Sequence, residues 1–179
     1  MSDVLEVVPY DASWPRMFSA ERDRIAAALG AVALRIDHNG STSVPGLAAK
    51  PIIDIQVSVA RLHPMDTYTP GLVRLGYLHV PHADDAFCPF FHRPPAWPHT
   101  HHVHVVQAGG DEERRTLAFR GYLREHPDVA RDYADLKHRL APQYAATEFA
   151  ARQAYADAKT TFITAIIERA FAEGYPRES

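Results

Sequence analysis

An aspartate and a pair of histidines are the residues in this chain whose types and spacing best suit a metal ion. Asp54 lies in PIIDIQVSV, whose alternate apolar residues would bury one face of a strand, so its carboxylate faces solvent, a partner or a metal. His102 and His104 are two residues apart in HHVHVV and point to the same side of a strand. Two imidazoles at that spacing can bind a transition metal or contact a phosphate, or they are merely satisfied polar side chains.

A second group of residues has the composition of an anion-binding turn. Gly40, Ser41, Thr42 and Ser43 are small, so backbone N–H groups can approach an anion, and the three hydroxyls add donors. Lys50 adds a cation at the far end of the same loop. The alternative interpretation is a polar loop whose hydroxyls satisfy its own backbone.

Composition excludes several classes of protein. The chain has 179 residues, one cysteine and a formal charge of −3, so it has no intramolecular disulfide, no multi-cysteine zinc cage and no general attraction to nucleic acids. No segment approaches the ~20 apolar residues that cross a bilayer, and the first residues do not resemble a signal peptide. These features predict a soluble, cytoplasmic protein that has no membrane partner. They leave its oligomeric state open.

The elements that would position these groups are mixed in the first part of the chain and helical afterwards. Alternating residues predict strands over 32–38, 52–59 and 101–107, and five prolines over 81–98 predict a long irregular loop without regular structure. From residue 111 onward the chain is helical in composition, with breaks near residues 126–127 and 141–142. This order predicts an α+β core over residues 1–110 and a helical region over 111–179, packed on the core or forming one compact domain with it.

Five segments closely resemble the GrpB family, also called UPF0157, and they occur in the family's order over nearly the whole chain. They are VVPYDASWP, HNGSTSVPGLAAKPIIDIQV, THHVHVV, LAFRGYLREHPDVARDYADLKHRLA and YADAKTTFI. The resemblance implies a nucleotidyltransferase-like fold with a mixed β-sheet and flanking helices. Related domains in this family are fused to dephospho-CoA kinase.

The resemblance also implies roles for particular residues. In such folds a Gly-Ser turn holds nucleotide phosphates, a following strand presents two acids that bind a divalent metal, and a later strand supplies a third acid. Gly40 and Ser41 match the turn and Asp54 matches the first acid, but Gln56 stands where the second acid is expected. Since His102 and His104 lie where the third acid is expected, they would complete a metal site with Asp54 if the two strands are neighbours.

These observations together predict a protein that binds a divalent metal and a nucleotide or other phosphorylated small molecule, with transferase-type activity. Asp54 and His104 are the expected catalytic residues. The metal would be Mg or Mn, or Zn, Fe or Ni through the histidines. Arg120, Lys137 and Lys159 are candidate phosphate-binding cations from the helical region. The alternatives are a degenerate module that binds a nucleotide or coenzyme without catalysis, and a transition-metal enzyme with an unrelated substrate.

Overall fold

The computed structural model describes residues 5–177, and the strands in this range form one mixed sheet. The strands are β1 (Arg35–Asn39), β2 (Ile53–Val59), β3 (Leu78–His79), β4 (Phe90–Arg93) and β5 (His101–Gln107). Their order across the sheet is β1-β2-β5-β4-β3. The central pair, β2 and β5, is parallel, and the other neighbours are antiparallel. The predicted strands are therefore present, although β1 begins later than expected because Gly30–Val32 forms a 3-10 turn.

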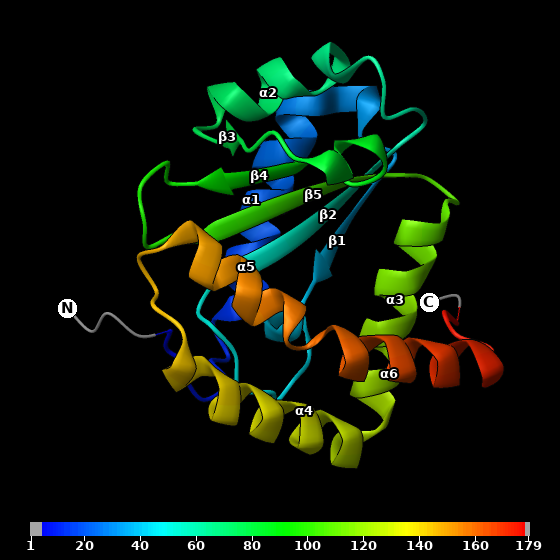
Figure 1. The fold of residues 1–179 in the computed structure, drawn as a ribbon. Helices are drawn as coiled ribbons and strands as arrows, with labels where there is room; N and C mark the ends of the chain where they lie inside the picture. Colours follow the sequence, from blue (N-terminus) through cyan, green and yellow to red (C-terminus); the bar gives the residue numbers. More distant parts are fainter. Residues whose placement is uncertain (1–4, 178–179) are drawn as a thin grey trace.

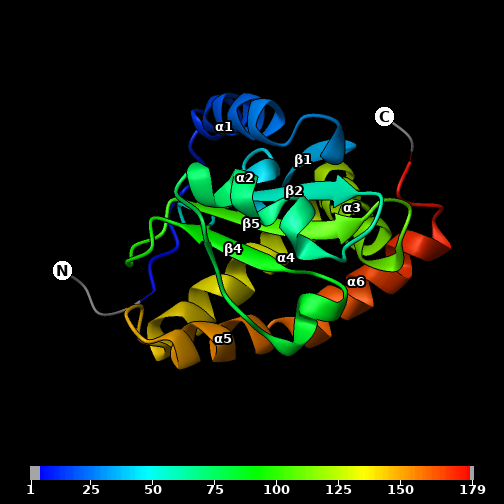
Figure 2. The ribbon, with the colours of Figure 1, turned by 90° about the horizontal axis from the view of Figure 1, so that it is seen from above.

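Helices cover both faces of this sheet (Figure 1). They are α1 (Trp14–Leu29), α2 (Thr69–Arg74), α3 (Asp111–Glu125), α4 (Pro127–Leu140), α5 (Phe149–Asp157) and α6 (Thr160–Ala172). Figure 2 shows α1 on one side of the sheet and α4, α5 and α6 on the other. The α+β fold class predicted from the sequence is confirmed, and the breaks near residues 126 and 141 separate helices as expected.

The two faces of the central strands have different chemistry. On β2, the alternate residues Ile53, Ile55 and Val57 are buried in the main hydrophobic cluster, which also holds residues of α1 and α2. Because side chains alternate along a strand, Asp54 and Gln56 lie on the opposite face, toward the later helices. Burial of one apolar face thus fixes where the polar side chains of β2 point.

The prediction of an irregular loop over residues 81–98 is wrong in one part, because β4 forms within this segment and pairs with β5. Pro89 and Pro94 lie just outside the four residues of β4, so the backbone N–H that each proline lacks is not needed inside the strand. This short strand adds Phe90 and His92 to the polar face of the sheet.

The helices after residue 110 pack on the loop that follows β1. Val44 and Leu47 from this loop share a buried hydrophobic cluster with residues of α3, α4 and α6. The expected division at residue 110 stays a prediction. Among the helices of residues 5–177, none combines the length and the apolar character needed to cross a membrane.

Candidate functional site

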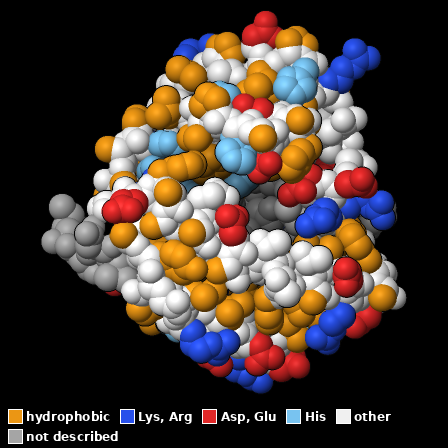
Figure 3. Space-filling model, viewed as in Figure 1, with side chains coloured by type: hydrophobic (Ala, Val, Ile, Leu, Met, Phe, Trp, Pro, Cys, Tyr) orange, Lys and Arg blue, Asp and Glu red, His pale blue; other side chains and the backbone are white. Residues whose placement is uncertain are grey.

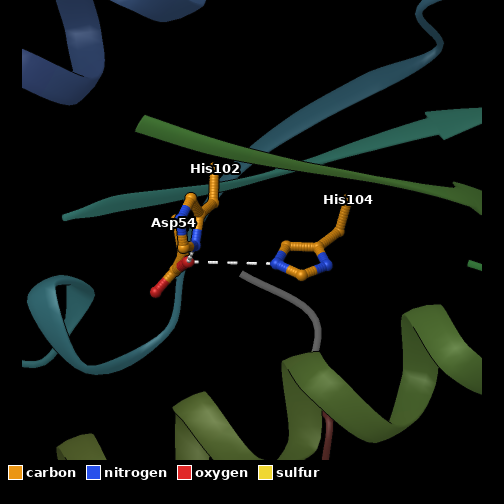
Figure 4. A group of neighbouring side chains, drawn as sticks. All are labelled: Asp54, His102 and His104. Atoms are coloured by element: carbon orange, nitrogen blue, oxygen red, sulfur yellow. Dashed lines mark ion pairs between the residues drawn. The ribbon is translucent and has the colours of Figure 1, made fainter. Parts of the chain in front are cut away.

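Asp54, His102 and His104 meet on the polar face of the sheet, because the parallel register of β2 and β5 places Asp54 opposite His102 and Gln56 opposite His104. Asp54 Oδ1 lies 3.3 Å from His102 Nδ1 and 3.8 Å from His104 Nε2. The three side chains point toward one another (Figure 4). Each offers one ligand atom, and these atoms all lie within 4.8 Å of one another. The arrangement therefore has the donor set and spacing of a two-histidine, one-carboxylate metal site.

The charges of this group are set by burial and by mutual hydrogen bonds. Burial opposes ionisation of Asp54, but hydrogen bonds from His102 and His104 outweigh it and hold the pKa of Asp54 well below its ordinary value. Burial lowers the pKa of His102 despite the nearby carboxylate. For His104, interactions with Asp54 and Cys88 overcome burial and raise the pKa. The site thus contains an ionised carboxylate beside a histidine that retains its proton, and a metal ion bound here would take the place of that proton.

The turn after β1 lies directly against Asp54. Gly40 has φ +64° and ψ −171°, a backbone conformation that is essentially restricted to glycine. A Cβ atom at Gly40 would lie 2.3 Å from Asp54 Oδ2. The turn continues as a 3-10 helix over Ser41–Ser43. Glycine is therefore required here both for the backbone conformation and for the close approach to the Asp54 carboxylate.

A cavity of about 360 Å³ connects these features. Figure 3 shows a hollow on the face viewed in Figure 1, with histidine side chains gathered beside it. The predicted site residues that line the cavity are Gly40, Ser41, Thr42, Lys50, Asp54, His102, His104, Lys137 and Lys159. Its volume is in the lower part of the range of small-molecule sites, roughly 300–1,000 Å³.

The lysines of this cavity are partly or fully removed from water. Burial lowers the pKa of Lys137 to about 7 and that of Lys159 to about 7, and it also lowers the pKa of Lys50. Lys137 Nζ donates to the carbonyl oxygen of Ala48, and Lys159 Nζ lies 4.1 Å from the centre of the Tyr155 ring. An anion in the cavity would restore the charge of these amines, so the cavity favours anionic ligands.

Two buried polar atoms on lining residues have no hydrogen-bond partner within residues 5–177, namely Gln56 Nε2 and Tyr155 Oη. Gln56 Oε1 accepts hydrogen bonds from Thr116 Oγ1 at 2.6 Å and Asn39 Nδ2 at 3.3 Å. The amide oxygen that replaces the expected second acid is therefore engaged within the protein. Because buried donors are normally paired, both atoms suit a ligand that carries acceptor oxygens.

Two residues predicted to bind phosphate do not line this cavity. Ser43 Oγ donates to the carbonyl oxygen of Gly40 at 2.6 Å, and Ser43 O accepts from Arg124. Arg120 Nη1 donates to His38 O at 2.8 Å and to Asp37 Oδ1 at 3.2 Å. Both residues stabilise the end of β1 and the turn, so we assign them no direct contact with a ligand. Thr42 lines the cavity, but its hydroxyl is already paired with His38 Nε2 at 3.0 Å.

Several lining residues were not predicted, including Asn39, Thr116, Tyr133 and Tyr155. Asn39 directly precedes Gly40, and this adjacency was the one signal available for it. The others lie on α3, α4 and α5, where nothing in the pattern shows which side of the helix faces the sheet.

The sheet, the helices and the cavity between them define an α+β protein with a carboxylate–histidine group beside a lysine-lined cavity. Comparison with known proteins gives the family. The GrpB protein family matches residues 4–169, which is most of the chain, and the chain belongs to this family.

Individual relatives support this assignment. A UPF0157 protein of Pseudomonas aeruginosa is 41% identical over 175 residues, which cover 95% of this chain and 69% of that protein. The crystal structure of the conserved protein GrpB from Enterococcus faecalis has a TM-score of 0.78 and 34% identity, covering 94% of this chain and 98% of the other. A dephospho-CoA kinase of Mycolicibacterium paratuberculosis is 31% identical over 157 residues, which cover 74% of this chain and 39% of the kinase.

Proposed function

We propose that this GrpB-family protein binds a nucleotide or another phosphorylated small molecule together with a divalent metal, and that it transfers a phosphorus-containing group. One observation carries the proposal: Asp54, His102 and His104 share a single cavity with the Gly40–Ser41 turn and with lysines. This pairing of a cation-binding group and an anion-binding group is what a metal-assisted phosphate site needs.

The donor set indicates the kind of metal. Two imidazoles and one carboxylate suit Mn, Fe, Zn or Ni better than Mg, which prefers oxygen ligands. Gln56 contributes no negative charge, and its oxygen is engaged by Asn39 and Thr116. Bound at Asp54, His102 and His104, the metal would polarise a phosphoryl oxygen.

The chain's own residues would orient and neutralise the ligand. Ser41 would donate hydrogen bonds to a phosphate oxygen at the turn, while Lys50, Lys137 and Lys159 would offset its charge. The ionised Asp54 would hold the cation. The His104 side chain is 35% exposed and that of His102 is 16% exposed, so His104 is the histidine more open to a ligand.

A nucleotide or coenzyme is the ligand class proposed here. The relative from Mycolicibacterium paratuberculosis is named a dephospho-CoA kinase, and this chain covers 39% of it, so the name links the family to a coenzyme by fusion alone. A nucleotidyltransferase-like activity is the form of transfer that the resemblance of the Gly-Ser turn and Asp54 implies.

The second candidate function is binding without catalysis, and Gln56 favours it. A single carboxylate neutralises a dication less completely than two, so a two-metal transfer loses support. A turnover assay with Mn²⁺ and nucleoside triphosphates separates the two functions, because a module would bind but release no product.

Calorimetric titration tests the binding shared by both functions. We expect Mn²⁺ or Zn²⁺ to bind stoichiometrically and to strengthen binding of inorganic tripolyphosphate. Asp54→Asn should abolish metal binding. Lys159→Met should weaken the binding of tripolyphosphate by about tenfold or more, which corresponds to the loss of one charge-assisted contact. Asp23→Asn, which changes an exposed carboxylate remote from the cavity, is the matched control. Unchanged binding in both site variants would contradict the proposal.

A further inference from the structure

A second cavity of about 380 Å³ adjoins the first on the polar face of the sheet. The two cavities share six lining residues, namely Lys50, Cys88, His102, His104, Glu112 and Ala156. They are therefore neighbours, and a ligand that passes these side chains would reach from the first cavity into the second. This second hollow takes no part in the function proposed above.

Aromatic rings from separate segments line this second cavity. They come from the loop before β4, from β4 and β5, from the loop before β5 and from α5, and they include Phe87, Phe90, Trp97 and Phe149. Rings drawn from so many segments onto one hollow give it walls of flat π-surface. Such surfaces favour a planar ring over an aliphatic or fully polar group.

Two of the imidazoles in this cavity, His92 and His99, are buried and lie face to face. His92 and His99 are stacked with their ring centres 3.8 Å apart and an interplanar angle of 12°. His92 Nδ1 is hydrogen-bonded to Pro94 O at 3.0 Å, and His99 Nδ1 to His102 Nε2 at 3.1 Å. With these nitrogens engaged, the pair suits stacking better than metal binding.

The charged side chains that line this cavity are the cations Lys50 and Arg152 and the carboxylates Asp84 and Glu112. The Arg152 guanidinium lies 4.6 Å from the centre of the Trp97 ring, which adds positive charge beside the aromatic wall. Phe87 is 49% exposed and Phe149 is 51% exposed, so both rings remain available for contact. A partner with an anionic end and a flat ring matches both cavities.

We propose that the second cavity binds the planar aromatic ring of the same ligand whose anionic end occupies the lysine-lined cavity. The ligand class is an aryl or heteroaryl compound that carries a phosphate, of which nucleoside phosphates are one kind. This inference rests on the proposed function and narrows it, because a phosphorylated sugar or other non-aromatic phosphate would leave the second cavity unfilled.

Comparison of ligands with and without a ring tests this inference. Calorimetry would compare inorganic tripolyphosphate with ATP, GTP, CTP and UTP, each with Mn²⁺, and tryptophan fluorescence would report stacking near Trp97. We expect at least one nucleotide to bind about 5- to 100-fold more tightly than tripolyphosphate, the range typical of base–aromatic stacking, and to quench fluorescence. Tripolyphosphate should leave the fluorescence unchanged.

Substitutions of exposed rings test whether the tighter binding of the nucleotide arises in the second cavity. Phe149→Ala and Phe87→Ala should each remove most of the nucleotide's advantage while leaving tripolyphosphate binding intact. Phe171→Ala is the matched control, since this phenylalanine is also exposed and lines neither cavity. Because all three rings are at the surface, loss of folding is not expected.

The outcomes separate this inference from the function on which it rests. If tripolyphosphate binds and no nucleotide binds more tightly, or if both cavity variants behave like Phe171→Ala, the aromatic subsite is overturned and the anion site stands. If neither tripolyphosphate nor any nucleotide binds, both proposals are overturned.

Discussion

The contact between Gly40 and Asp54 leads to a quantitative prediction for Gly40→Ala. The backbone conformation at Gly40 costs other residues about 1–3 kcal/mol. The new Cβ would in addition lie 2.3 Å from Asp54 Oδ2 and 2.9 Å from its Cγ, so the carboxyl group must move. Breaking the hydrogen bonds of a buried polar group costs about 1–3 kcal/mol more. We expect Gly40→Ala to lower the free energy of unfolding by about 2–6 kcal/mol in total.

A double-mutant cycle isolates the part of this cost that comes from Asp54. Asp54→Ala removes the oxygen and the Cγ that the new methyl group would meet but keeps the Cβ, which lies 2.9 Å away. Gly40→Ala should therefore cost about 1–2 kcal/mol less in that background, with part of the steric cost remaining. Gly46→Ala is the control, because Gly46 has φ +79° and a Cβ atom added there would meet no atom of residues 5–177 within 4 Å. It should cost only about 1–2 kcal/mol for the backbone.

Urea unfolding monitored by circular dichroism gives these free energies, and thermal unfolding gives a second measure. For a chain of this length each kcal/mol corresponds to roughly 2–4 °C in Tm. Additivity of Gly40→Ala and Asp54→Ala within about 0.5 kcal/mol would refute the close packing of the turn against the carboxylate. Equal costs for Gly40→Ala and Gly46→Ala would refute it as well.

Three further predictions concern charge in the cavity. Sulfate affinity should fall as the pH rises above about 7, because the bound anion favours the charged forms of Lys137 and Lys159, whose pKa values are each lowered to about 7. The affinity should fall about tenfold per pH unit for each proton taken up on binding. Calorimetry from pH 6 to 9 would measure this dependence, and an affinity that does not change with pH would contradict it. At pH 6 the Lys159 side chain is charged and its burial opposes folding, so Lys159→Met should raise Tm by roughly 2–8 °C. An unchanged or lower Tm would argue against the burial of this charge. Gln56→Glu places a second carboxylate beside Asp54. The two charges repel each other, so the variant should have a lower Tm without metal, and together they should strengthen Mg²⁺ binding about tenfold or more. Weaker Mg²⁺ binding would contradict the placement of residue 56 beside the metal site.

The sequence predicted those parts of the site that depend on local periodicity. The alternation in β2 showed that Asp54 lies opposite the apolar face, and the spacing of His102 and His104 placed both on one side of β5. Whether the two strands were neighbours could not be read from either strand, because strand pairing depends on the whole sheet. The parallel register of β2 and β5 supplied this missing contact.

Other parts depended on tertiary packing that leaves no local signal. Pro89 and Pro94 favoured an irregular segment, yet β4 fits between them. Arg120 and Lys137 have similar surroundings in the sequence, but Arg120 pairs with Asp37 while Lys137 lines the cavity. The orientation of a helix around its own axis decides between these outcomes, and it is set by the surface on which the helix packs.

Anomalous diffraction from a crystal grown with Mn²⁺ and tripolyphosphate would show whether a metal and a phosphate share this cavity. We expect a manganese peak at roughly 2.0–2.2 Å from Asp54 Oδ1 and from one nitrogen each of His102 and His104, with phosphate density between Ser41 and Lys159. Manganese bound elsewhere at saturating concentration, with phosphate outside the cavity, would contradict this expectation.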